Sequence, residues 1–114
     1  MRILHVDDDP EDSLLLRLAL EKAGITAEVT DVPSVAGALA ALGDLPTAET
    51  YAAVVVDNGL PDGLGATLGL VLRATGVPFV VYTGDPGGVR GAPDVAVISK
   101  AKPEELMNWL RRIA

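Results

Sequence analysis

Cysteine is absent from this chain of 114 residues, histidine and tryptophan occur once each, and aromatic residues make up only 4% of it. Without thiols the chain cannot form disulfides, use a cysteine nucleophile or build a zinc–thiolate site. A single histidine leaves little scope for a histidine-built metal site or a catalytic triad. These absences make the acidic residues the most informative feature of the sequence.

Long apolar runs and an excess of basic residues are also missing. No uninterrupted apolar stretch approaches the roughly 20 residues that span a bilayer, and the amino terminus lacks the regions of a signal peptide. Lysine and arginine number 9 against 16 acidic residues, a formal net charge of −7, which argues against binding to nucleic acid. We therefore expect one compact domain, residues 1–114, in the cytoplasm, with neither membrane nor nucleic acid as a partner.

Short apolar segments alternate along the chain with segments of helical character. Asp9 and Pro10 fit the cap and first position of a helix, as Pro103 does near the end of the chain. Apolar strands that alternate with helices favour a parallel sheet covered on both faces. The predicted strands are 2–7, 25–31, 52–57, 77–83 and 94–98, and the predicted helices are 10–23, 34–42, 64–75 and a last one that begins at Pro103.

One segment interrupts this alternation. Residues 84–93 occupy the place of a further helix but contain four glycines and two prolines. This composition makes a stable helix very unfavourable there. We predict a flexible loop that rearranges on activation.

Carboxylates follow two of the predicted strands. Asp7, Asp8 and Asp9 come directly after the apolar residues 3–6, and Asp57 ends the apolar stretch 52–56. Carboxylates brought together at strand ends repel one another unless a cation lies between them, and oxygen ligands of this kind suit Mg²⁺. The alternative is that Asp7 and Asp8 only end a strand, while Asp9 only caps the helix that follows.

Four segments, in this order, resemble a response-regulator receiver domain. They are residues 3–10, residues 56–63, Thr83-Gly84 and Ser99-Lys100. The resemblance implies a flavodoxin-like, doubly wound α/β fold whose five-stranded parallel sheet has the order 2-1-3-4-5. It also implies two-component signalling, in which a sensor histidine kinase or a histidine phosphotransfer protein donates a phosphoryl group.

The resemblance assigns roles to particular residues. Asp57 accepts the phosphoryl group in a Mg²⁺-dependent reaction, so the chain is a signalling module and acts as an enzyme only on itself. The Mg²⁺ ligands are Asp8, Asp57 and the backbone carbonyl of Gly59, with Asp7 acting through water. Lys100 pairs with the phosphoryl oxygens, and Thr83 hydrogen-bonds to the phosphorylated form. Taken alone, Thr83 could be an ordinary strand-terminal hydroxyl and Lys100 a solvated lysine.

The sequence departs from the receiver pattern in three places. Val97 replaces the aromatic residue usually found three positions before the lysine, no proline directly follows Lys100, and the fourth helix is missing. Residues 78–84 resemble the signature of a mostly alphaproteobacterial subset called FAT GUY receivers, although Tyr82 replaces an alanine of that signature. That subset also lacks a regular fourth helix and the switch aromatic.

Other functions of the same fold remain alternatives. A pseudo-receiver would bind its partner without phosphorylation, but the presence of Asp8, Asp57, Thr83 and Lys100 argues against it. A Mg²⁺-dependent phosphohydrolase would need a general acid near the nucleophile and a substrate cap, and the sequence offers neither. Asp85 could act on a water, but it lies in the predicted loop. Without an output domain, the chain must signal through an unknown downstream protein or act as a phosphate sink.

Three smaller features complete the predictions. Leucines lie on more than one face of the first helix, with Leu14, Leu15 and Leu18 on one of them. The leucines of this helix either provide an exposed kinase-docking patch or are all buried or scattered; they are Leu14, Leu15, Leu16, Leu18 and Leu20. We expect His5 to be a core histidine and Asp62 to belong to a turn with Pro61 and Gly63.

Overall fold

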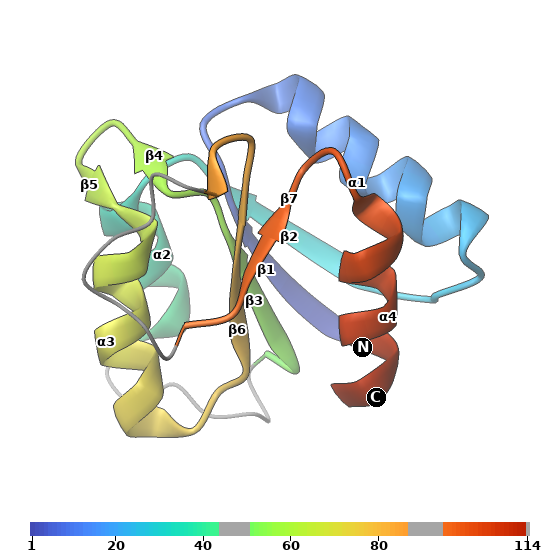
Figure 1. The fold of residues 1–114 in the computed structure, drawn as a ribbon. Helices are drawn as coiled ribbons and strands as arrows, with labels where there is room; N and C mark the ends of the chain where they lie inside the picture. Colours follow the sequence, from blue (N-terminus) through green and yellow to red (C-terminus); the bar gives the residue numbers. More distant parts are fainter. Residues whose placement is uncertain (44–50, 87–94, 114) are drawn as a thin grey trace.

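A computed structural model of the chain describes residues 1–43, 51–86 and 95–113. Its centre is a five-stranded parallel sheet with the strand order β2-β1-β3-β6-β7 (Figure 1). Because β4 and β5 form a separate hairpin, this is the predicted order 2-1-3-4-5. The strands are β1 (Arg2–Val6), β2 (Glu28–Val32), β3 (Ala53–Val56), β6 (Phe79–Thr83) and β7 (Val97–Ser99).

The second strand begins later than the predicted range 25–31. At the end of α1 (Pro10–Lys22), the amide of Gly24 donates to the carbonyl of Glu21 and the amide of Ile25 to that of Leu20. Gly24 adopts a φ of +70°, the left-handed conformation that commonly ends a helix. The chain therefore joins the sheet only at Glu28.

Both faces of the sheet are covered by helices. In Figure 1, α1 and α4 (Pro103–Ile113) cover one face, while α2 (Val35–Leu42) and α3 (Gly65–Thr75) cover the other. Successive strand side chains point to opposite faces, so strands such as β1 and β3 contribute to two cores. One core contains Leu4, Val6, Ala38, Leu42, Val54, Val56, Leu68 and Leu72, and the other Ile3, Leu16, Leu20, Val55, Val80, Ile98, Leu106 and Leu110.

The leucines of α1 divide between the core and the surface. Leu16 and Leu20 face the sheet and are buried, whereas Leu14, Leu15 and Leu18 are 57%, 54% and 51% exposed. The three predicted to share a face do so, and that face points to solvent. The structure therefore confirms that three of the five leucines are exposed, while their docking to a kinase stays a prediction.

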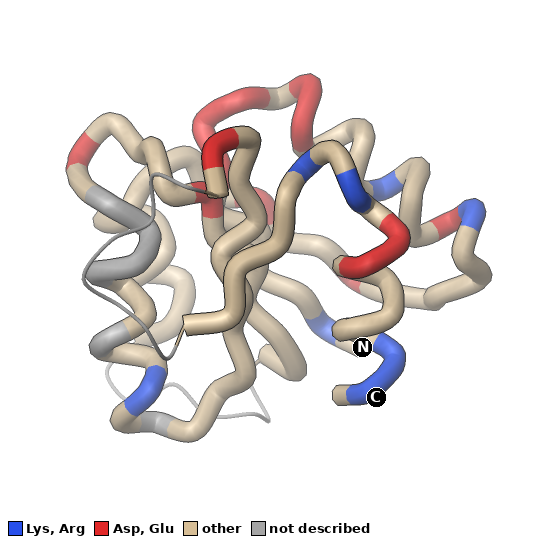
Figure 2. Tube along the Cα trace, in the orientation of Figure 1, with Lys and Arg blue, Asp and Glu red and all other residues tan. Residues whose placement is uncertain are grey.

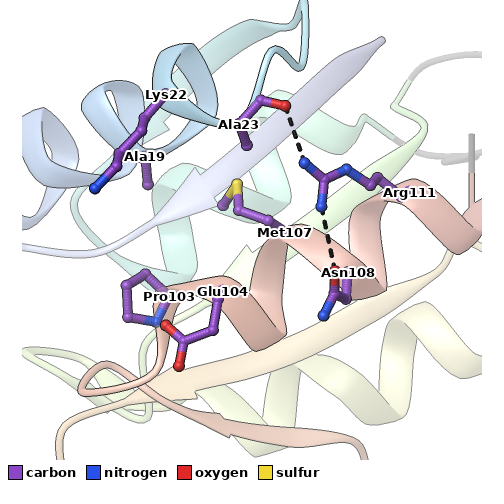
Figure 3. Close-up of a pocket in the computed structure, with 8 residues that line it drawn as sticks. All are labelled: Ala19, Lys22, Ala23, Pro103, Glu104, Met107, Asn108 and Arg111. Carbon is purple, nitrogen blue, oxygen red and sulfur yellow. Dashed lines mark hydrogen bonds between the residues drawn. The ribbon is translucent and has the colours of Figure 1, made fainter.

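The two helices on this face lie side by side with a groove between them. A groove of about 260 Å³ between α1 and α4 is lined by apolar residues such as Ala19 and Met107, with charged residues at its rim (Figure 3). Arg111 donates a hydrogen bond of 2.9 Å to the carbonyl of Ala23, which is the C-cap residue of α1. This bond satisfies a terminal carbonyl of α1 and ties that end of the helix to α4.

A short antiparallel hairpin follows β3 that the sequence did not predict. It consists of β4 (Gly59–Leu60) and β5 (Gly63–Leu64), and Asp62 lies in its turn as expected. The Asp62 carboxylate accepts hydrogen bonds from the amides of Val35 and Ala36 at 2.8 and 3.0 Å. Asp62 therefore caps α2 from outside that helix.

Removal of this external cap should produce a pH-dependent loss of stability. The amides of Ala36 and Val35 hold the pKa of Asp62 below its usual value. A depressed carboxylate pKa stabilises the fold above the unfolded-state pKa of about 3.9, and the contribution disappears as the pH falls through the lower folded-state value. Asp62→Ala should therefore unfold more easily than the wild type at neutral pH, and the difference should shrink below about pH 4, as measured by denaturant titration.

The matched control is Asp62→Asn, which keeps an oxygen acceptor but cannot ionise in this range. Its difference from the wild type should fall much less with pH than that of Asp62→Ala. If the Asp62→Ala difference is the same in acid as at neutral pH, the ionised carboxylate does not provide the cap.

Helix α3 forms despite a glycine near its centre. A Cβ atom at Gly69 would lie 2.5 Å from Cε2 of the Phe79 ring, closer than atoms can pack. The missing side chain lets the start of β6 pack against α3, which offsets the low helical propensity of glycine.

Most of the loop predicted at 84–93, in place of a fourth helix, lies outside the described residues. None of the helices in the described ranges is long and apolar enough to cross a membrane.

Candidate functional site

Four predicted site residues lie at the carboxyl ends of four neighbouring strands. Asp7 follows β1, Asp57 follows β3, Thr83 ends β6 and Lys100 follows β7. The amides of Asp7, Asp57 and Lys100 each donate to a carbonyl of the adjacent strand, at 3.0, 2.8 and 2.9 Å. The sheet ladder thus continues one residue past the strands and fixes the backbone from which these side chains project.

The carboxylates at this edge form one compact group. One oxygen each from Asp7, Asp8 and Asp57 lies within 4.8 Å of the others. Figure 2 shows acidic residues gathered at this end of the molecule. Three hard oxygen donors that combine a buried, a partly buried and an exposed carboxylate fit a Mg²⁺ ion that keeps some of its waters.

Lys100 supplies the positive charge within this group. Its Nζ atom lies 2.7 Å from Oδ2 of Asp12, 2.8 Å from Oδ2 of Asp7 and 3.6 Å from Oδ1 of Asp57. Burial by itself would lower the pKa of Lys100, but the hydrogen bonds to Asp12 and Asp7 outweigh it, and the pKa is raised. The lysine is therefore held firmly in its charged form.

Asp7 is the most enclosed carboxylate of the site, with a side chain that is 1% exposed. Burial raises the pKa of Asp7, against the lowering effect of Lys100 and of the Asp9 amide, which donates to Asp7 at 3.0 Å. The charge of Asp57 raises it further. The pKa values of Asp7 and of Lys100 are both raised, although the two groups are paired. This is possible because Lys100 has Asp12 and Asp57 as additional partners. A cation at this position would relieve the unfavourable burial of Asp7.

His5 is the core histidine that the sequence predicted, and it supports the site from below. It is 1% exposed, its Nδ1 lies 2.9 Å from Oδ1 of Asp31, and its Nε2 lies 3.8 Å from Oδ2 of Asp7. Burial raises the pKa of Asp31, but its hydrogen bonds with His5 and Arg17 reverse this, and the pKa is lowered. The buried His5 ring thus lies between Asp31 on the second strand and Asp7.

The remaining predicted residues have clear positions. The side chain of Asp9 accepts a hydrogen bond of 2.9 Å from the amide of Glu11, so its role as a helix cap is confirmed. Thr83 is 5% exposed, and its Oγ1 accepts from the amide of Asp85 at 3.2 Å. Gly59 begins β4, two residues after Asp57, and the role of its carbonyl stays a prediction.

Sequence reasoning missed Asp12 and Asp31. Asp12 lies in the first turn of α1, where acidic residues are common because they favour the helix dipole. Its partner Lys100 is 88 positions away. No local pattern marks such a pair, since the contact depends on how α1 lies over the sheet.

Comparison of the sequence with protein-family models and with curated proteins gave no match. Solved structures are similar over nearly the whole chain. A sensor protein from Polaromonas sp. JS666 is 32% identical with a TM-score of 0.76, and the match covers 98% of this chain and 94% of that one. A CheY-like response regulator receiver domain from Methylobacillus flagellatus is 25% identical, with a TM-score of 0.73 and coverage of 100% and 98%.

A third similar structure contains a metal. The receiver domain of a sensor histidine kinase from Pseudomonas aeruginosa PAO1 has a magnesium ion coordinated in its active-site cleft. It is 27% identical, with a TM-score of 0.73, and the match covers 97% of this chain and 94% of that one. None of these comparisons confirms the FAT GUY subset, which stays a prediction.

Proposed function

This chain belongs to the family of response-regulator receiver domains, and from that premise we propose that Asp57 accepts a phosphoryl group from a phosphohistidine in a two-component pathway. The observation that carries the proposal is the meeting of Asp7, Asp8, Asp57 and Lys100 at one edge of the sheet. A nucleophilic carboxylate, an oxygen cluster for a cation and a fixed ammonium are what phosphoryl transfer to aspartate requires.

In the proposed reaction, a carboxylate oxygen of Asp57 attacks the phosphorus of the donor. A new O–P bond forms, the P–N bond to the donor imidazole breaks, and the imidazole nitrogen keeps the bond's electron pair and takes a proton. Lys100 Nζ, 3.6 Å from the Asp57 carboxylate, can pair with the incoming phosphoryl oxygens. The Thr83 hydroxyl, at the end of the neighbouring strand, can donate a hydrogen bond to the same group.

The cluster of carboxylate oxygens fits magnesium, which Asp8, Asp57 and the Gly59 carbonyl would hold, with Asp7 contributing through water. When bound, it would supply positive charge that stabilises the transferring phosphoryl group. The chain's own residues orient the nucleophile and hold Lys100 charged beside it. The product is a signalling state that another protein reads, or a store of phosphate.

An amide NMR titration with Mg²⁺ followed by beryllofluoride, a mimic of aspartyl phosphate, tests the proposal. We expect the amide signals of Asp8 and Asp57 to shift with Mg²⁺, and those of Thr83 and Lys100 to shift when beryllofluoride is added. A response to metal without any response to beryllofluoride would indicate a cation site that does not accept phosphate. No response to either would favour the pseudo-receiver.

The donor should dock on the exposed face of α1. Leu14, Leu15 and Leu18, which we call the leucine surface, are each more than half exposed and begin two residues after Asp12, a direct partner of Lys100. Large apolar side chains that are exposed next to one another are typical of a surface that binds another protein. We infer that the histidine-bearing helix of a kinase or phosphotransfer protein covers this surface.

Loss of the leucine surface should slow transfer from a protein donor only. Leu14→Ser combined with Leu18→Ser is expected to reduce phosphorylation by a phosphorylated histidine phosphotransfer protein roughly tenfold or more, as for a central interface contact. Phosphorylation by acetyl phosphate, which needs no docking, should stay at the wild-type rate. Both rates can be followed by the mass increase of the chain.

The matched control is Leu39→Ser, because Leu39 is a 44% exposed leucine on α2, on the opposite face of the sheet. It should leave both rates unchanged. If the double variant loses both rates equally, or if Leu39→Ser is as slow as the double variant, the donor does not dock on α1.

A further inference from the structure

Lys100 is held more closely by Asp12 than by the nucleophile it is expected to assist. Its Nζ lies 2.7 Å from Asp12 Oδ2 but 3.6 Å from Asp57 Oδ1, beyond ordinary hydrogen-bond distance. An ammonium group has three donors, and Asp12 and Asp7 each accept one at short distance. The lysine is thus drawn away from Asp57 toward α1.

The position of Asp12 in the fold favours its ion pair with Lys100. It lies in the first turn of α1, which begins at Pro10 and is capped by Asp9, so its backbone is fixed. Its side chain is 27% exposed and that of Lys100 20%, so the pair is only partly screened by water. The contact joins α1 to the segment between β7 and α4.

We propose that Asp12 is a positioning residue that restrains Lys100 in the unphosphorylated protein and must release it when Asp57 carries a phosphoryl group. This inference rests on the proposed function and adds a regulator of the same site. Asp12 touches neither the phosphoryl group nor the nucleophile, and acts only through Lys100.

The charges explain why release would accompany phosphorylation. A phosphoryl group brings nearly two negative charges and strong acceptor oxygens, so it competes with Asp12 for the same ammonium. Lys100 needs to move by only roughly 1 Å to reach hydrogen-bond distance from the Asp57 side. Because Asp12 and the phosphoryl group compete for the same ammonium, whatever weakens the interaction of Asp12 with Lys100 strengthens binding at Asp57.

The surroundings of the Asp12–Lys100 pair keep the free-energy cost of separating the two side chains low. A groove of about 250 Å³ lies beside it, lined in part by Asp12, Leu15, Tyr82 and Lys100. Water in this groove can solvate the Asp12 carboxylate once the lysine has left, which avoids an unpaired buried charge.

The test is the dissociation constant for beryllofluoride at saturating Mg²⁺, measured by NMR for the whole chain. Asp12→Ala should bind roughly fivefold more tightly than the wild type, which corresponds to about 1 kcal/mol. Asp12→Glu restores a carboxylate on the same turn and should return toward the wild-type value. Glu11→Ala makes the same change in charge at the adjacent exposed position and should bind as the wild type does.

Each contrary result has its own meaning. Unchanged or weaker binding in Asp12→Ala would overturn the proposal, since Asp12 would then be neutral or helpful to the phosphorylated state. An equal gain in Glu11→Ala would also overturn it, because net charge would then account for the effect. A wild type that does not bind beryllofluoride would refute the proposed function itself, whereas wild-type binding with an inert Asp12 would refute only this inference.

Discussion

Asp57→Asn is expected to abolish phosphorylation of the chain by acetyl phosphate and by phosphohistidine donors. The amide oxygen of asparagine is a far weaker nucleophile than a carboxylate, and no anionic acyl phosphate can form on it. Intact-protein mass spectrometry should show the mass of one phosphoryl group added to the wild type in the presence of Mg²⁺, and none added to the variant. The beryllofluoride shifts at Thr83 and Lys100 should disappear as well.

This loss should not reflect unfolding. Asp57 is repelled by Asp7 and attracted by Lys100, so neutralising it should change the free energy of unfolding only slightly in the absence of metal. Asp62→Asn makes the same change in an exposed turn away from the group and should be phosphorylated normally. Phosphorylation of Asp57→Asn at another aspartate, mapped by peptide analysis, would show that the acceptor is wrongly assigned.

Leu110→Ala should cause the largest loss of stability among the changes considered. Leu110 is fully buried in the core between α4 and the sheet, together with Leu16, Leu20 and Leu106. Removing a leucine side chain from such a site costs about 2–5 kcal/mol, because apolar contact is lost and a cavity remains. That is a large part of the stability of a typical domain of this size. Urea titration followed by circular dichroism would measure it.

The control for this prediction is Arg112→Ala, on the exposed side of the same helix. It should change the free energy of unfolding by less than about 0.5 kcal/mol. If Leu110→Ala costs no more than Arg112→Ala, α4 does not pack on the sheet as described. As long as the variant is folded, its affinity for beryllofluoride should stay near that of the wild type, since Leu110 lies away from the site.

Much of the fold could be predicted because its signals are local. Apolar runs such as residues 52–56 are typical of strands in a parallel sheet that is buried on both faces. Asp9 caps α1 through an amide two residues away, and Gly43 ends α2 with a φ of +73°. Such features depend on a few neighbouring residues, so a single sequence displays them.

Features that depend on the packing of distant segments could not be predicted. The leucines of α1 offered two candidate faces, and only the position of the helix over the sheet decided that Leu16 and Leu20 are inside. Asp62 caps α2, whose first residues lie 26 and 27 positions before it. Sequence spacing carries no information about such contacts.

The candidate site combines both kinds of information. The residue types that end the strands can be read from the sequence, and parallel strands bring Asp7, Asp57, Thr83 and Lys100 to one edge whatever the details of packing. Which carboxylates Lys100 meets depends on the packing of the helices, because hydrogen-bond distances are sensitive to helix position to within about 1 Å. The contact between Asp12 on α1 and Lys100 therefore follows from the packing of the folded chain, and no local sequence pattern predicts it.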